Sequence, residues 1–190
     1  MTLSGALAVL TAIGLAGCEA APAAAPPEAP PPQAGSQAAA VFGVSFDHAA
    51  GLQTRACEGE APRCTVLFDP SAEAFLRDLL TVQVHDGPLE TVAAAEAGFE
   101  RNAEGRLMST YGRFEPVAVE PFEVNGRSGL RAVITCGISD PETGFHAGAG
   151  ECLWAVVSNG EQSAVISSSG FGNGLEAAEA AVRSMKFTSD

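Results

Sequence analysis

Positive charge is scarce in this chain of 190 residues: 10 Lys and Arg stand against 23 Asp and Glu, and the formal net charge at pH 7 is −13. A surplus of carboxylates repels phosphate backbones, so we expect no nucleic-acid partner and consider an anionic substrate disfavoured. Apolar residues are not scarce, at 46% of the chain. This fraction and this length are enough for one globular domain with a hydrophobic core, plus an extension.

Established catalytic motifs are also missing. No Gly-x-Ser-x-Gly occurs, and the run from Ser167 to Gly170 lacks the first glycine of a nucleophile elbow. The glycines of 170–174 precede a predicted helix without the Gly-Lys-Ser/Thr of a phosphate loop. His48 and His85 each stand beside an aspartate at the end of a predicted element, which indicates solvated loop residues. We therefore predict no enzyme activity, no metal and no cofactor.

One glycine-rich loop remains as a candidate for ligand chemistry, because it holds the third histidine, His146. Three carboxylates share the loop with it: Asp140, Glu142 and Glu151. Their spacing matches neither a calcium loop nor a zinc-protease motif. We interpret the loop as a flexible hairpin held at its base by two cysteines. An envelope hydrolase or metal-dependent enzyme built on the His146 loop stays open as an alternative.

The N-terminal segment 1–17 is apolar or small throughout and ends in Leu15-Ala16-Gly17-Cys18. It is too short for a comfortable membrane span and is typical of a secretory signal. Its end resembles the Leu-x-Gly-Cys lipobox of bacterial lipoproteins. The resemblance implies that Cys18 becomes the lipid-modified first residue of the mature chain, anchored in the membrane by several acyl chains.

Segment 18–40 is predicted to be a semi-rigid spacer, since it lacks apolar periodicity. It contains six prolines: Pro22, Pro26, Pro27, Pro30, Pro31 and Pro32. In polyproline geometry, at about 3.1 Å per residue, it would reach roughly 70 Å. Glu19 follows the lipobox, which in enterobacterial lipoproteins favours the outer over the inner membrane. We therefore expect a periplasm-facing envelope protein whose single globular domain spans 41–190.

Four cysteines remain in that domain, an even count that predicts two disulfides with three possible connectivities. We favour Cys57–Cys64 and Cys136–Cys152, because each pair flanks a segment of turn-forming residues. The spacings match neither zinc sites nor the Cys-x-x-Cys of thiol oxidoreductases.

Hydrophobic periodicity predicts an α+β domain, an antiparallel β-sheet flanked by helices. In its first half we expect a strand over 42–46, a short helix from Asp69-Pro70 to 79, a strand over 81–85 and a helix over 91–101. Strands follow over 107–114, 117–124, 128–136, 152–157 and 164–169, and an amphipathic helix over 175–185. Asn125-Gly126 predicts a tight hairpin turn, and Trp154 is expected in the core.

Three stretches resemble the PsbP-like or DcrB-like α/β/α sandwich of small bacterial envelope lipoproteins. They are Phe42-Gly-Val-Ser-Phe-Asp-His-Ala-Ala-Gly51, Val124-Asn-Gly-Arg-Ser-Gly-Leu-Arg131 and Val182-Arg-Ser-Met-Lys-Phe187. The resemblance implies protein binding, assembly support or chaperoning without catalysis.

The expected function is therefore a lipid-anchored, non-catalytic binding or accessory role with an envelope protein as partner. The acidic surface would favour a cationic partner face. An immunity or inhibitor protein for a secreted toxin is one specific form of this hypothesis. A purely structural lipoprotein is another alternative.

Overall fold

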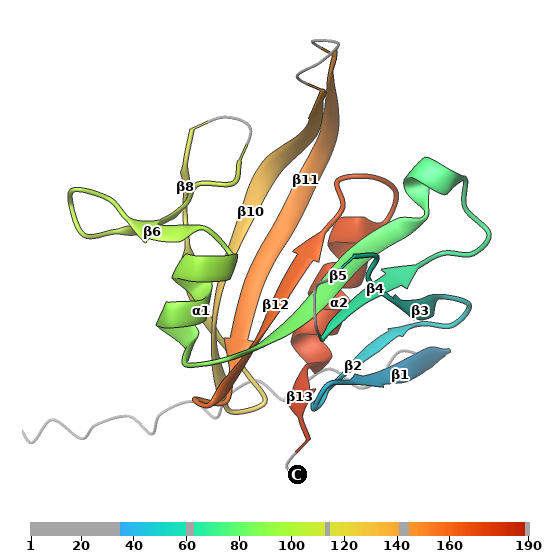
Figure 1. The fold of residues 1–190 in the computed structure, drawn as a ribbon, viewed down its shortest axis with the longest axis horizontal. Helices are drawn as coiled ribbons and strands as arrows, with labels where there is room; N and C mark the ends of the chain where they lie inside the picture. Colours follow the sequence, from blue (N-terminus) through green and yellow to red (C-terminus); the bar gives the residue numbers. More distant parts are fainter. Residues whose placement is uncertain (1–34, 60–62, 113–114, 141–144, 189–190) are drawn as a thin grey trace, which may run out of the picture.

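The computed structural model describes residues 35–59, 63–112, 115–140 and 145–188, and its centre is a seven-stranded antiparallel sheet (Figure 1). In spatial order the strands are β3 (Gln53–Ala56), β4 (Cys64–Phe68), β5 (Asp78–Asp86), β12 (Gln162–Ser168), β11 (Phe145–Ser158), β10 (Arg127–Asp140) and β9 (Glu120–Val124). The predicted signal segment, Cys18 and the spacer up to residue 34 lie outside the described residues.

Both faces of this sheet carry further elements. One face packs against helix α2 (Gly174–Ser184) and a small sheet of β1 (Ser36–Val41), β2 (Val44–Ala49) and β13 (Lys186–Phe187). The other carries α1 (Leu89–Glu96) and a small sheet of β6 (Phe99–Arg101), β7 (Leu107–Ser109) and β8 (Val117–Ala118). The prediction of an antiparallel sheet flanked by helices is confirmed. None of the described helices is long and apolar enough to cross a membrane.

The α2 face of the sheet is covered over β5, β11 and β12. Alternate residues of β5 point into this core, so that Leu80 and Val82 lie at 2% and 0% exposure beside Phe46 of β2. The buried stripe of α2 includes two small side chains, Ala178 and Ala181. Small side chains let the helix approach the sheet closely, which fixes α2 against β5, β11 and β12.

The α1 face is covered only in part. Val92 and Ala93 of α1 and Phe99 of β6 form a second core with Ile134 of β10 and Val165 of β12. α1 packs on β10, β11 and β12, and β8 packs on β10. In the described structure the β3–β4 side of this face therefore has no helix over it (Figure 1).

Several element boundaries differ from the prediction. The helix expected over 91–101 ends at Glu96, because Gly98 has φ +61° and turns the chain into strand β6. The helix expected from Pro70 is reduced to the 3₁₀ turn η1 (Ala74–Leu76), because the following leucines and valines alternate into strand β5. Of the strand expected over 107–114, the described residues form only β7, and residues 113–114 lie outside the described part.

The N-terminal boundary of the folded part also differs. β1 begins at Ser36, which pairs with Ala49 of β2, within the segment that composition assigned to the spacer. Alanine-rich residues can form this strand because Ala39 is buried opposite Phe46. The turn at Asn125-Gly126 is confirmed, with φ values of 49° and 70° between β9 and β10.

Candidate binding surfaces

The predicted His146 loop lies on the long β10–β11 hairpin. Backbone pairing places Ser139 opposite His146 and Asp140 opposite Phe145. The side chains of Asp140 and His146, and all of Glu142, lie outside the described part of the structure. Glu151 is exposed opposite Thr135. The hydrolase hypothesis thus stays a prediction, and among the described residues no group of three His, Cys, Asp or Glu side chains is placed to hold a metal ion.

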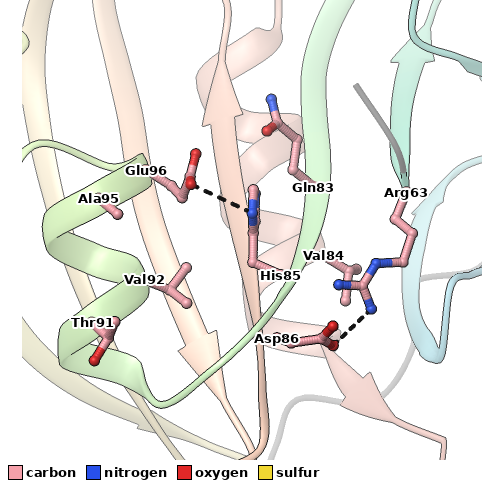
Figure 2. Close-up of a pocket in the computed structure, with 9 residues that line it drawn as sticks. All are labelled: Arg63, Gln83, Val84, His85, Asp86, Thr91, Val92, Ala95 and Glu96. Atoms are coloured by element: carbon pink, nitrogen blue, oxygen red, sulfur yellow. Dashed lines mark hydrogen bonds and ion pairs between the residues drawn. The ribbon is translucent and has the colours of Figure 1, made fainter. Parts of the chain in front are cut away.

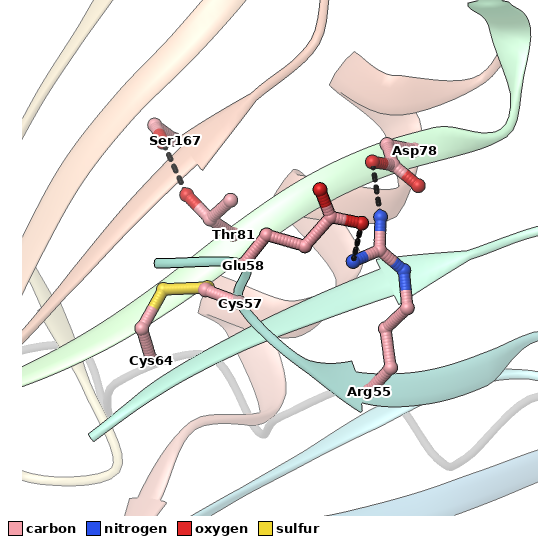
Figure 3. The surroundings of a disulfide bond; sticks show 7 residues. All are labelled: Arg55, Cys57, Glu58, Cys64, Asp78, Thr81 and Ser167. Carbon is pink, nitrogen blue, oxygen red and sulfur yellow. Dashed lines mark hydrogen bonds and ion pairs between the residues drawn. A yellow bond between two sulfur atoms is a disulfide. The ribbon is translucent and has the colours of Figure 1, made fainter. Parts of the chain in front are cut away.

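Two disulfides are present, with the pairing that the sequence favours. Cys136 joins Cys152 midway along the β10–β11 hairpin, at the shift in its strand register, and Cys57 joins Cys64 between β3 and β4. Beside the Cys57–Cys64 bond, Arg55 Nη2 donates a hydrogen bond to Asp78 Oδ2 at 2.7 Å, and Arg55 Nη1 lies 3.7 Å from Glu58 Oε1 (Figure 3). This ion pair network ties the short edge strand β3 to β5.

A cleft of about 560 Å³ separates α1 from β5 (Figure 2). Gln83 and His85 form its floor, Glu96 of α1 one wall, and Arg63 with Asp86 the other. Arg63 Nη1 donates to Asp86 Oδ1 at 2.9 Å. This hydrogen bond, followed by one from Gln162, lowers the pKa of Asp86 below its ordinary value of 3.8. The cleft therefore holds charges of both signs beside apolar side chains such as Val92 and Ala95.

His85 is the unusual side chain of this cleft. Its Nδ1 lies 3.7 Å from Glu96 Oε1. Its Nε2 is buried and has no hydrogen-bond partner among the described residues. A buried ring nitrogen without a partner is a cost to folding rather than a contribution to it. The predictions for two histidines were wrong: His85 lies on β5 beneath α1, and His48 is 8% exposed on β2, with Nδ1 3.0 Å from the Ala49 carbonyl.

A second hollow, of about 420 Å³, lies over the Cys136–Cys152 bond. Tyr111 and Trp154 line it as an edge-to-face pair, with ring centroids 4.7 Å apart. Ile134, Gly137 and Ser168 complete the lining. Tyr111 is 46% exposed, and Trp154, expected in the core, is only half-buried. The hollow thus presents aromatic rings and a disulfide to solvent.

A second aromatic pair, Phe75 of η1 and Phe171, lies at the same end of the molecule as the β10–β11 hairpin (Figure 1). Their ring centroids are 6.4 Å apart in an edge-to-face arrangement, and Phe75 is 69% exposed. Gly170, the residue before Phe171, packs closely against Gly150 of β11. A Cβ atom on Gly150 would lie only 3.2 Å from the Gly170 carbonyl oxygen. Both pairs therefore adjoin the β10–β11 hairpin. We call the end of the molecule that carries Phe75, Phe171, Tyr111, Trp154 and the Cys136–Cys152 bond the hairpin end.

The hairpin end lies far from the C-terminal strand. In Figure 1, η1 and the projecting β10–β11 hairpin occupy one end of the molecule and β13 the other. Another exposed aromatic residue, Phe42, is 44% exposed in the β1–β2 turn, where the Gly43 carbonyl accepts a hydrogen bond from Thr188 N. Phe42 thus marks the opposite end. No sequence signal joined Tyr111 to Trp154 or Phe75 to Phe171, because each pair is brought together only by the sheet.

The arrangement is an α+β sandwich, and comparison with solved structures finds similar ones. Cyanobacterial PsbP (CyanoP) from Synechocystis sp. PCC 6803 is 15% identical over 81% of this chain and 93% of its own, with a TM-score of 0.49. A protein of Bacteroides thetaiotaomicron VPI-5482 is 8% identical over 78% of this chain, with a TM-score of 0.46. The chain spans 46% of that protein's length. The likeness concerns the fold alone.

Sequence comparison adds no family. No protein-family model matches the chain, and no curated protein matches it in sequence.

Proposed function

We propose that this chain is a lipid-anchored, exported binding protein of the bacterial cell envelope that engages another protein through the hairpin end and catalyses no reaction. The lipobox at Cys18 supports the anchor, and the proline-rich segment that follows supports a spacer between membrane and domain. Two disulfides in a small domain support an oxidising compartment such as the periplasm.

The observation that carries the proposal is the pair of exposed aromatic contacts at the hairpin end. Phe75 and Tyr111 expose 69% and 46% of their surface although each already has an aromatic neighbour. Tyrosine and tryptophan side chains supply much of the binding energy at protein interfaces. A protein partner at this end of the domain would cover both exposed rings.

A crosslinked pull-down from detergent-solubilised envelopes tests this function. The bait is the full-length chain in three forms: Cys18→Ser, which removes the anchor; Phe75→Ser with Tyr111→Ser, which removes the exposed rings; and Phe42→Ser, the matched control at the opposite end. We expect a stoichiometric partner with the Cys18→Ser and Phe42→Ser baits and its loss with the double variant. Equal recovery with all three baits would exclude the hairpin end as the binding surface.

The anchor is tested separately by intact mass. The mature protein is expected to begin at Cys18 with the added mass of its acyl chains. A mature chain with an unmodified Cys18 would refute the lipid anchor and leave the binding surface unaffected.

A further inference from the structure

We infer that two copies of this chain associate through strand β1, which pairs antiparallel with the β1 of the second copy and joins the two small sheets into one continuous sheet. The inference does not depend on the proposed binding at the hairpin end. It follows from the hydrogen-bonding pattern of β1 and from a comparison of the sheet edges.

β1 directs the backbone groups of alternate residues away from its neighbour β2. The Ala50 amide donates to the Gly35 carbonyl at 2.7 Å, so these two residues form a hydrogen-bonded pair just beyond the ends of the two strands. Hydrogen-bonded and non-bonded pairs alternate along an antiparallel ladder. β1 is the outermost strand of its sheet and lies at the periphery of the domain (Figure 1). The amides and carbonyls that point outward from it therefore belong to Ser36, Ala38 and Ala40.

The outermost strands of the other edges are protected against such pairing. In β9 the outward backbone groups belong to Pro121 and Glu123, because the two-residue turn at 125–126 is closed by a hydrogen-bonded pair. Proline has no amide to donate, and a charge opposes the approach of another strand. β3 has only four residues and contains the ion-paired Arg55, and β6, β8 and β13 have two or three residues each. Among the outermost strands of the described sheets, β1 alone combines six residues with no proline and no charge.

The partner that this edge fits is a second copy of the same strand. About a two-fold axis at Ala38, Ser36 of one copy faces Ala40 of the other, so each outward amide meets an outward carbonyl. Small side chains meet at each of these positions, and no like charges lie opposite each other. A foreign extended peptide would gain specificity only from side-chain pockets along the strand. The two hollows described above are lined by other elements, so the symmetric pairing is the one that this edge selects.

The expected association is weak, because a single strand forms the interface. At about 3.4 Å per residue, the six residues of β1 span roughly 20 Å, and small interfaces are typical of transient complexes. The net charge of −13 opposes the approach of two copies at long range. Since β1 itself carries no charge, added salt screens this repulsion and strengthens the dimer.

Sedimentation equilibrium of the chain from residue 18 onward, with Cys18→Ser, measures this association between about 1 μM and about 1 mM, the range of weak interfaces. We expect a monomer–dimer equilibrium whose dissociation constant falls several-fold between about 50 mM and about 500 mM NaCl. Ala38→Pro removes the two amide donors that meet on the axis, one from each copy, and is expected to weaken the dimer on the order of tenfold or more. Ala38→Lys places like charges opposite each other and is expected to weaken it several-fold.

Thr54 of β3 is the matched control position. It is exposed like Ala38, and its amide also points outward, because the Cys57 amide donates to the Cys64 carbonyl at 3.2 Å and the pairs alternate from there. Thr54→Pro and Thr54→Lys are expected to leave the dissociation constant unchanged. Thermal unfolding of all four variants shows that each is folded, since none removes an amide that pairs within its own sheet.

A crosslink tests the register. The Cα atoms of a hydrogen-bonded antiparallel pair lie about 5.5 Å apart, which a disulfide can span. Ala38→Cys is therefore expected to give a disulfide-linked dimer under mild oxidation, and Thr54→Cys is not.

Several results would overturn the inference. They are a monomer at every concentration, equal weakening by the Ala38 and Thr54 variants, or a dimer that salt weakens, which would indicate charged contacts. A dimer that Phe75→Ser dissociates and Ala38→Pro does not would assign the contact to the hairpin end instead. The pull-down with Phe75→Ser and Tyr111→Ser decides the proposed function separately.

Discussion

The two faces of the central sheet differ in how completely they are used for folding. On the α2 face, Phe46, Leu67 and Ile166 are at most 1% exposed beneath α2 and the β1–β2–β13 sheet. On the α1 face, Trp154 is half-buried, and His85 Nε2 is buried without a described partner. Both hollows are lined from the α1 face. Both faces thus contribute a core, but only the α1 face keeps hollows beside its core among the described residues.

The largest expected effect is a truncation in the closed core. Phe46→Ala removes a ring at 1% exposure and is expected to lower the free energy of unfolding by about 3 to 5 kcal/mol. Trp154→Ala, on the α1 face, should lower the free energy of unfolding clearly less, since the ring is only half-buried. Chemical denaturation of both variants measures the difference. A loss for Trp154→Ala equal to that for Phe46→Ala would remove the contrast between the faces.

The second-largest expected effect is the loss of stability on removing a disulfide, which differs between the two bonds. Replacing Cys136 and Cys152 with serine is expected to cost about 3 kcal/mol, and replacing Cys57 and Cys64 about 2.5 kcal/mol, according to the length of the loop that each bond closes. The first change alone should also move the Trp154 emission, because that bond lines the same hollow. Identical emission spectra for both double variants would show that the hollow keeps its shape without the Cys136–Cys152 bond.

The sequence predicted those elements whose formation depends on local signals. The amphipathic helix expected over 175–185 is α2, and the Asn125-Gly126 turn takes the positive φ values that its residues favour. The helix expected over 91–101 was too long, because Ala-rich helical spacing continued past Gly98, where the backbone reverses. Residues after η1 form β5 because pairing with β4 and β12 outweighs local helix propensity.

The candidate binding surfaces could not be predicted from the sequence, for a different reason. Tyr111 meets Trp154 only because β7 and β11 are placed together by the sheets, and Phe75 meets Phe171 through the turns at one end of β5 and β12. His85 was interpreted as a loop residue because Asp86-Gly87-Pro88 follows it. Its burial comes from α1, which begins just beyond that turn and folds back over the strand.

Replacing the two histidines is expected to change the free energy of unfolding by smaller amounts and in opposite directions. His85→Leu removes a buried nitrogen that lacks a described partner, and we expect the free energy of unfolding to stay the same or rise by up to about 1 kcal/mol. His48→Leu is the matched change on the closed side. It loses the contact of Nδ1 with the Ala49 carbonyl and should destabilise the protein. Denaturation at pH 7 compares the two, and a marked loss for His85→Leu would mean that the ring supports α1.

The smallest expected effect is the pH response of the cleft. Arg63, followed by Gln162, lowers the pKa of Asp86 in the folded protein below 3.8, so the stabilisation by this carboxylate is present above that pH and is lost as pH falls through the lowered value. Asp86→Asn should therefore reduce the melting temperature slightly at pH 7 and flatten its fall between about pH 4 and about pH 2. Arg63→Gln removes the principal hydrogen-bond donor and should flatten the same range. If neither variant changes the fall of the melting temperature at acid pH, the Arg63–Asp86 pair contributes nothing to folding.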